Sequence, residues 1–333
     1  PIMNLAVSSA TVLSDLAILE FSGVDTPAFL QGQLSNDVMA VTADTAMLAA
    51  YCNPKGRTLA TLVFWRMSDT PDNEPVFQAL VKADIADALV KRLTMFVLRS
   101  KVKIRRLTAQ AVGLKLGDGN ALSGAVVPEI NGLNLSALPD IPAPYQVFSH
   151  PGGISITAPK NQPDVQRYWF IPAQAQATSL QANDNALSQW QTDDILAGLP
   201  WIEQATQEAF IPQTLNLDLI NGVSFTKGCY PGQEVVARSH YRGTVKRRMA
   251  RGTTNVPAEH IASLAGQDIF NAHSAHPESP AGRVVNAAHD DTQAQLLLEV
   301  KLTEMAQAQY RLGEPDGPAI TLASLPYQIN VSS

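Results

Sequence analysis

One of the two cysteines in the sequence lies in the stretch KGCYPGQEVVAR, residues 227–238, and is the strongest candidate for chemistry. Gly228 lets the backbone bend tightly, and Pro231 suits the first turn of the helix that GQEVVARSHY predicts. Cys229 then lies just before a helix N-terminus, whose free N–H groups and positive dipole end stabilise a thiolate. Lys227 adds a cation two residues away. From this spacing alone, a functional thiol and a buried structural cysteine are equally good interpretations.

A cluster of cations follows the cysteine. Six Lys and Arg side chains lie within 14 residues, and no Asp or Glu occurs between Glu234 and Glu259. In a chain with a net charge of −6, this patch suits carboxylates or phosphates, although a solvated face at a domain junction explains it equally well. Tyr241 is the one Phe, Trp or Tyr in this stretch, so we do not expect direct nucleic-acid binding. The cations are Arg238, Arg242, Lys246, Arg247, Arg248 and Arg251.

The other candidates are weaker. Cys52 lies within an apolar strand pattern, which favours simple packing. His273 and His276 have the spacing of metal ligands, but no Cys or acidic cluster lies near them in the sequence, so we predict no metal site. Trp190 could stack on a planar ligand, although packing in the core is the better interpretation from its position alone.

The composition limits the class of protein. The chain has 333 residues, of which 45% are hydrophobic and 16% charged, as is ordinary for a globular protein with a sizeable core. Two cysteines cannot form a disulfide framework, which indicates a reducing compartment. We find no signal-peptide pattern and no apolar run long enough to span a bilayer. We therefore expect a cytoplasmic protein with no membrane association.

The elements that must position these residues indicate an α+β fold, because strands occur with one or two helices per block and not in regular βαβ units. Residues 139–153 are rich in Pro and Gly and indicate a loop. From about residue 245 onward, short segments separated by turn residues predict a small β-barrel, with a boundary near 244. Strands are predicted at 16–21, 47–52, 58–67, 76–81, 101–107, 111–116 and 168–172, and helices at 23–38, 83–98 and 185–198. Within the barrel, strands are predicted in KRRMARGTT, QDIFN, GRVVNAAH, AQLLLEVKL and YQIN.

Residues 210–248, FIPQTLNLDLINGVSFTKGCYPGQEVVARSHYRGTVKRR, closely resemble the signature region of the YgfZ family. The K-G-C-Y-x-G-Q-E core is highly specific. Supporting matches are spread over most of the chain, in FSGVDTPAFLQGQLSNDV, AYCNPKGRTLATLVFWR, QWQTDDILAGLPWI and LPYQI. Members of this family are folate-binding proteins linked to the maintenance of iron–sulfur enzymes and, through it, to tRNA modification.

The resemblance implies the fold of the glycine cleavage T-protein, an aminomethyltransferase that uses tetrahydrofolate. That fold has three subdomains around a central folate channel, and the last subdomain is a β-barrel. We therefore expect a folate-binding α+β body at 1–244, made of two subdomains, and a barrel at 245–333. The second subdomain of the body spans 163–244 and contains the KGCYPGQE motif. The implied cofactor is tetrahydrofolate or a derivative, and the implied partners are iron–sulfur client enzymes, including enzymes that modify tRNA.

The resemblance also implies roles for individual residues. Cys229 matches the cysteine of the family motif and is the expected functional thiol. Trp190 matches a tryptophan implicated in folate contact, while Leu16 replaces a second, N-terminal tryptophan of that contact. The expected cofactor-binding residues are Trp190, Lys227, Tyr230, Gln233, Glu234, Arg238 and Arg242. The two arginines belong to the cationic patch, which would receive the glutamate tail of folate.

The alternative function is a tetrahydrofolate-dependent aminomethyltransferase or other C1 transferase of the T-protein kind. T-protein carries a pair of aspartates after its first hairpin turn, where this chain has Gly56-Arg57-Thr58-Leu59-Ala60-Thr61. T-protein also binds the pterin through a Glu, and Leu196 occupies that place here. Without these carboxylates, aminomethyl transfer loses its polar machinery, so we do not expect an ordinary aminomethyltransferase. Folate-dependent thiol chemistry at Cys229 stays open.

Overall fold

The structure is a computed structural model that describes residues 5–118, 130, 132–173, 180–243 and 245–329. The chain forms two compact units and passes between them several times. The first unit comprises Pro1–Leu30, Val38–Met47 and Val63–Trp190, and the second comprises Gln31–Asp37, Leu48–Leu62 and Gln191–Ser333. The domain boundaries that the sequence suggests near 163 and 244 stay predictions, and Thr244 itself lies outside the described residues.

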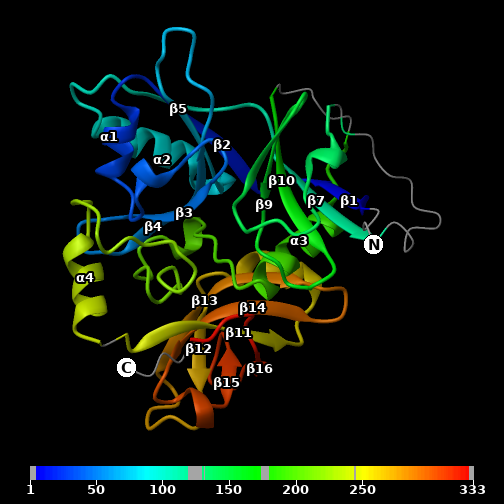
Figure 1. Cartoon of the computed structure of the whole chain (residues 1–333). Helices are drawn as coiled ribbons and strands as arrows, with labels where there is room; N and C mark the ends of the chain where they lie inside the picture. The colour runs from blue at the N-terminus through cyan, green and yellow to red at the C-terminus, as the bar shows by residue number, and fades with distance from the viewer. Residues whose placement is uncertain (1–4, 119–129, 131, 174–179, 244, 330–333) are drawn as a thin grey trace. The chain divides into compact units, whose positions relative to one another are not determined.

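Two five-stranded sheets account for most of the first half of the chain (Figure 1). Helix α2, Ala83–Met95, packs on the sheet of order β3-β4-β5-β2-β6 and buries Ile85, Leu89 and Leu93 as the helical spacing predicts. It ends before the predicted residue 98, and Phe96, which has the same spacing, is exposed. Its strands are β2 Leu16–Ser22, β3 Met47–Cys52, β4 Thr58–Arg66, β5 Val76–Lys82 and β6 Lys103–Arg106. The other sheet has the order β1-β7-β10-β9-β8. Its strands are β1 Leu5–Val12, β7 Val112–Asp118, β8 Val147–His150, β9 Gly153–Thr157 and β10 Gln166–Pro172.

The structure corrects three sequence predictions in this part. Helix α1 spans only Thr26–Gln31, so the helix predicted at 23–38 is reduced to six residues, fewer than two turns. The loop predicted at 139–153 contains β8 and most of the hairpin that joins it to β9, with Pro151 and Gly152 in the turn. The four prolines and two glycines of this segment indicated a loop, and they concealed the short strand between them. The first strand, β1, has no counterpart among the predicted strands, although it pairs with β7 over its full length.

The predicted β-barrel is confirmed. Six strands close in the order β11-β14-β13-β12-β15-β16 (Figure 1, yellow to red). Between Val245 and Ile329 the structure contains short 3-10 turns, Ala258–Ser263 and Met305–Gln307, and no α-helix, as expected. The predicted strand YQIN is wrong within its described residues, and β15 and β16 close the barrel instead. The strands are β11 Arg247–Thr254, β12 Asp268–Asn271, β13 Pro280–His289, β14 Ala294–Lys301, β15 Tyr310–Leu312 and β16 Ala319–Ala323.

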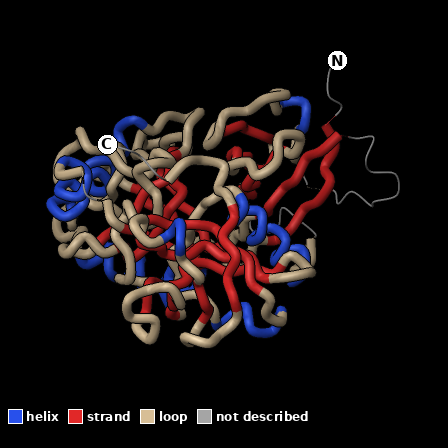
Figure 2. The backbone as a smooth tube through the Cα atoms, turned by 90° about the horizontal axis from the view of Figure 1, so that it is seen from below, coloured by secondary structure: helices blue, strands red, loops and turns tan. Residues whose placement is uncertain are grey.

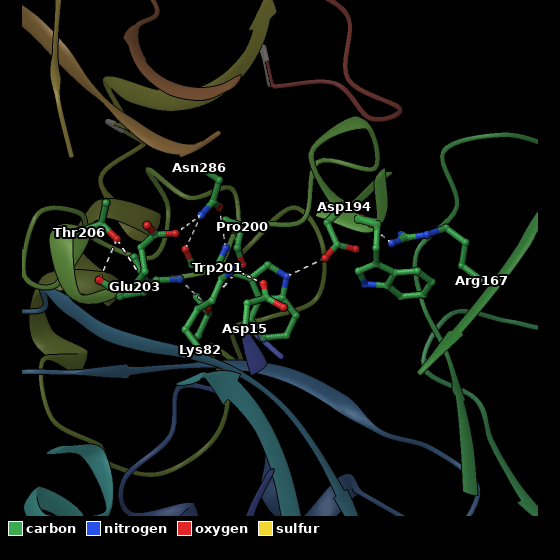
Figure 3. Close-up of polar contacts among 12 residues, drawn as sticks. Asp15, Lys82, Arg167, Asp194, Pro200, Trp201, Glu203, Thr206 and Asn286 are labelled. Atoms are coloured by element: carbon green, nitrogen blue, oxygen red, sulfur yellow. Dashed lines mark hydrogen bonds and ion pairs between the residues drawn. The ribbon is translucent and has the colours of Figure 1, made fainter. Parts of the chain in front are cut away.

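Strands and loops make up most of the chain, and the helices are short (Figure 2). Helix α3 spans Asp184–Leu196. Trp201, which follows it, is hydrogen-bonded to Asn286 of barrel strand β13. Asn286 Oδ1 accepts a hydrogen bond from Trp201 N, and Asn286 Nδ2 donates to Trp201 O, both at 2.8 Å (Figure 3). Trp201 Nε1 donates to Asp194 Oδ2 at 3.1 Å. These bonds fix the segment that follows α3 against the barrel within the second unit.

Candidate functional site

The loop that carries Cys229 leads into helix α4, Gln233–Tyr241, as predicted from the sequence. The predicted start is corrected: Pro231 precedes the helix, and Gly232 is the N-cap residue with a left-handed φ of 80°. Gly232 packs directly on the β3–β4 turn, where a Cβ atom would lie 2.5 Å from Gly56 Cα and 2.6 Å from Asn53 O. The backbone of the Cys229 loop is therefore in direct contact with the backbone of the β3–β4 turn.

The β3–β4 turn is itself tied together by Asn53. Its Oδ1 accepts from the backbone N–H groups of Lys55 and Arg57, each at 3.0 Å, and its Nδ2 donates to Glu208 Oε1 at 2.9 Å. The sequence indicated only a turn composition here. Asn53 shapes the turn on which the Cys229 loop packs. The sequence did not predict this contact, because the loop lies more than 170 residues further along the chain.

The Lys227 side chain contacts backbone carbonyl groups of an earlier segment of the chain. Its Nζ donates to Leu34 O at 2.5 Å and to Gln31 O, and it lies 4.9 Å from the centre of the Tyr230 ring. Gln233 Nε2 lies 3.4 Å from Lys227 O, which closes the loop onto the first residue of α4. The cation that the sequence placed two residues from Cys229 is thus a structural tie that holds the loop to 31–34, a segment of the same unit.

Burial lowers the pKa of Lys227 to about 8, although the nearby Asp37 carboxylate opposes the shift. A lysine whose pKa is lower in the folded state binds its proton less readily there than when unfolded. We therefore expect stability to rise with pH between about 8 and the ordinary lysine value of about 10.4, and Lys227 to contribute no pH dependence below that window. Denaturant unfolding of wild type and Lys227→Met across pH 7 to 11 measures this. A pH slope that is the same in both proteins would contradict it.

Cys229 is exposed and Cys52 is buried, as expected. Cys52 lies on β3 with 1% of its surface exposed, and burial raises its pKa to about 12. Tyr230 is buried next to Cys229 in the sequence, and burial also raises the pKa of its phenol. The motif therefore presents one thiol to solvent while the tyrosine beside it anchors the loop.

The cationic patch is divided by the fold. Arg248 is buried and forms an ion pair with Asp218 at 2.6 Å, and Arg251 donates to Ser324 O and Gln295 Oε1. Arg247 donates to Ala281 O at 2.7 Å. Exposed cations remain at Arg238, Arg242 and Lys246, and the acidic Glu234 is also exposed on α4. The patch available to an anion is thus half of the one that the sequence indicates.

Trp190 is 2% exposed and packs in the first unit. A Cβ atom on Gly113 would lie 2.6 Å from its ring, and the Arg167 guanidinium carbon is 4.1 Å from the ring centre. The indole Nε1 is buried and has no hydrogen-bond partner among the described residues. The sequence analysis did not single out Arg167. The signal that could have found it is a single arginine within the apolar strand QRYWFIP. Leu16 is buried in β2, and Leu196 ends α3 half-buried.

Further findings limit other kinds of site. Within the described ranges, no helix is both long and apolar enough to cross a membrane. Among the same residues, no three His, Cys, Asp or Glu side chains are grouped so that they could hold a metal ion.

The sequence is similar to those of known bacterial proteins. No family model matches the chain. The tRNA-modifying protein YgfZ of Pectobacterium carotovorum subsp. carotovorum (strain PC1) is 32% identical over 333 residues, which cover 95% of this chain and 91% of that protein. The tRNA-modifying protein YgfZ of Yersinia pestis (strain Pestoides F) is 31% identical over 267 residues, covering 77% and 73%.

In structure, the chain is similar to the glycine cleavage system aminomethyltransferase T of Bartonella henselae. The TM-score is 0.64, the similarity covers 96% of this chain and 86% of that one, and 14% of the residues are identical. At this identity the similarity shows the fold alone. The predicted T-protein-like fold is confirmed by it.

Proposed function

Because the chain belongs to the family of the tRNA-modifying protein YgfZ, we propose that it is a folate-dependent accessory protein for iron–sulfur enzymes, including enzymes that modify tRNA. It would support the assembly or repair of these enzymes, with Cys229 as the functional thiol. The observation that carries the proposal is the exposure of Cys229 on a loop whose neighbours are tied down. Lys227, Tyr230 and Gly232 are each committed to contacts that hold the loop, whereas the thiol is exposed.

Cys229 has the exposure expected of a reactive thiol and not the burial expected of a cysteine that packs in the core. A packing cysteine is buried among apolar side chains, as Cys52 is, whereas thiol chemistry needs access to a partner. A fixed backbone around the thiol also lowers the entropy lost when a partner docks on it. The tie between Lys227 and the carbonyls of Gln31 and Leu34 supplies that fixed backbone.

The residues present fit a folate in two respects. The buried indole N–H of Trp190 has no partner among the described residues, and a carbonyl or ring nitrogen of folate would accept its hydrogen bond. Because both the ring and this N–H group are buried, contact between Trp190 and folate requires the side chains packed around the ring to move. Arg238 and Arg242 are exposed and suit the carboxylates of the glutamate tail. Bound tetrahydrofolate would supply a carrier for one-carbon units.

The aminomethyltransferase alternative has less support. At the turn where T-protein carries its aspartates, Arg57 donates to Ala209 O, and the Glu208 carboxylate accepts from Asn53. Leu196 offers no charge to a pterin. The shared fold by itself does not supply the polar groups that the transfer needs.

The function is tested by the loss of the thiol in cells. In a strain that lacks the native gene, Cys229→Ala should reduce the activity of an iron–sulfur tRNA-modifying enzyme to the level of the empty strain. The readout is the fraction of modified nucleoside in total tRNA, measured by mass spectrometry. Cys52→Ala, at matched protein level, is the control for removing a cysteine and should retain most of the activity. Full modification with Cys229→Ala would exclude the thiol from the function.

Folate binding is tested by calorimetry with tetrahydrofolate. Trp190→Phe keeps an aromatic ring but removes the N–H group, and we expect it to weaken binding by about tenfold, the value of one hydrogen bond to a buried group. Arg238→Gln with Arg242→Gln should weaken the triglutamate form more than the monoglutamate form. Equal affinities in all proteins would remove these residues from the site. No heat at millimolar ligand would contradict folate binding itself.

A further inference from the structure

The end of helix α2 carries a group of exposed apolar side chains. Seven large hydrophobic side chains are exposed among the described residues, and four of them lie in or beside the turn that joins α2 to β6. Leu98 is 87% exposed and Met95 is 66% exposed. Val24 lies beside them, because a Cβ atom on Gly23 would be 2.1 Å from Lys101 O at the end of the same turn. The four residues are Val24, Met95, Phe96 and Leu98, and we call them the α2 tip.

Neither packing nor backbone preference explains a leucine at position 98. Its φ is 50°, a left-handed conformation that residues other than Gly, Asn and Asp adopt at a cost. A glycine or an asparagine would fit this turn better and would not expose an apolar side chain to water. Contact with a partner that covers the side chain would account for the leucine.

The α2 tip lies within a long cationic segment. Residues 88–117 contain eight Lys and Arg and no Asp or Glu, in a chain with a net charge of −6. Three of these cations, Lys91, Arg99 and Lys101, are exposed, and their side chains form no hydrogen bond or ion pair with another described residue. Lys91 precedes Met95 by four residues, so the two share one face of α2. Arg99 directly follows the exposed leucine in the turn.

The nearby carboxylates are engaged elsewhere or outnumbered. Asp87 Oδ1 lies 3.3 Å from Arg106 Nη1, and Asp25 Oδ2 accepts from Lys101 N at 2.7 Å. Arg92 is half-buried, and its guanidinium carbon lies 6.0 Å from the centre of the Phe96 ring, so it adds a further positive charge beside the tip. The surface around the exposed apolar side chains therefore carries a net positive charge.

These features favour a lipid surface over other partners. A second copy of this chain would place cations against cations. Nucleic-acid phosphates would pair with the cations, but Val24, Met95 and Leu98 are aliphatic and give bases no ring to stack on. Protein interfaces are depleted in lysine, which supplies two of the three exposed cations here. An anionic bilayer attracts Lys and Arg to its headgroups and takes up apolar side chains just below them.

We propose that the α2 tip binds the surface of an anionic lipid bilayer. The apolar side chains of the tip enter the boundary between headgroups and acyl chains, and the three exposed cations contact the headgroup phosphates. We expected no membrane association because the sequence has no long apolar run, but contact with one face of a bilayer needs no such run. The surface uses neither Cys229 nor Trp190, so it is independent of the proposed function and can fail or succeed separately from it.

The probes are vesicles of phosphatidylcholine alone and vesicles that contain about one third phosphatidylglycerol, mixed with the full chain and separated by flotation. We expect the protein to bind the anionic vesicles at least about tenfold more tightly than the neutral ones, and to be released from them at about 0.5 M salt. Binding to the anionic vesicles that is no tighter than to the neutral ones overturns the proposal. Binding of total tRNA in place of the vesicles also overturns it, because the cations would then be assigned to RNA phosphates.

Leu98→Asn tests the apolar contact without weakening the fold. Asparagine tolerates a left-handed φ, so the thermal midpoint of this variant should equal or exceed that of wild type. Its binding to the anionic vesicles should be weaker by about tenfold. Ile141→Asn is the matched control and should leave binding unchanged, because Ile141 is 84% exposed elsewhere in the first unit, ahead of β8. Equal binding by the two variants would reject the tip as the contact.

The cations are tested by a pair of substitutions. Arg99→Gln with Lys101→Gln should weaken vesicle binding by about tenfold or more, since each cation near an anionic surface contributes about fivefold. Lys55→Gln with Lys246→Gln removes the same charge from two exposed cations of the second unit and should leave binding unchanged. An equal loss in both pairs would show that overall charge, and not the α2 tip, attracts the lipid, and would overturn the proposal.

Discussion

Iodoacetamide should label Cys229 and leave Cys52 unmodified when it is added to the native protein at pH 8. The thiolate is the reactive form, and a thiol with a pKa of about 12 is ionised to only about one part in 10⁴ at that pH. Cys52 is also 1% exposed, so the reagent cannot reach it without local opening, whereas Cys229 is exposed. We expect labelling rates that differ by about 10³-fold or more, read by peptide mass spectrometry.

The denatured chain is the control for this measurement. In concentrated urea both cysteines should react at similar rates, because burial no longer separates them. The comparison bears directly on the proposed function, which needs an accessible thiol at Cys229. If Cys52 reacts as fast as Cys229 in the native protein, the assignment of one inert and one functional thiol fails.

Gly232→Ala should destabilise the second unit strongly, and Gly228→Ala should not. Gly232 has a φ of 80°, and an added Cβ would lie within 2.7 Å of three backbone atoms of the β3–β4 turn, so helix α4 or the turn must move. We expect a loss of about 2–4 kcal/mol, or a midpoint lower by roughly 5–15 °C, from the combined φ strain and clash. Thermal unfolding followed by circular dichroism measures this change.

Gly228 is the matched control, because it lies four residues away in the same motif. A Cβ at Gly228 would meet nothing within 4 Å, and its φ is not in the left-handed range. Gly228→Ala should therefore change stability by no more than about 0.5 kcal/mol. Similar midpoints for both variants would show that the contact between Gly232 and the turn does not hold the Cys229 loop.

Local patterns in the sequence predicted the elements that local rules control. The apolar spacing of Ile85, Leu89 and Leu93 predicted α2, and the change to short segments after residue 245 predicted the barrel. Local rules failed where pairing with a distant strand decided the structure. Strand β1 exists because β7, 100 residues or more away, pairs with it, and the prolines and glycines of 139–153 concealed a hairpin.

The candidate site shows the same division. The motif around Cys229, its position ahead of a helix and the burial of Cys52 followed from residue types and spacing. The partners of Lys227 did not, because Gln31 and Leu34 lie more than 190 residues earlier in the chain. The sequence also did not predict the division of the cationic patch, in which Arg248 is buried and paired with Asp218.

By itself, the sequence singled out Cys229 as the candidate thiol, through the family motif that surrounds it, and predicted the helix that follows it. The tertiary structure decided which neighbours are available to a ligand and which are committed to holding the loop. The physical reason is that helix and strand periodicities depend on residues a few positions apart. The burial of a charge and the close approach of Gly232 to Gly56 depend on segments that meet only when the chain folds.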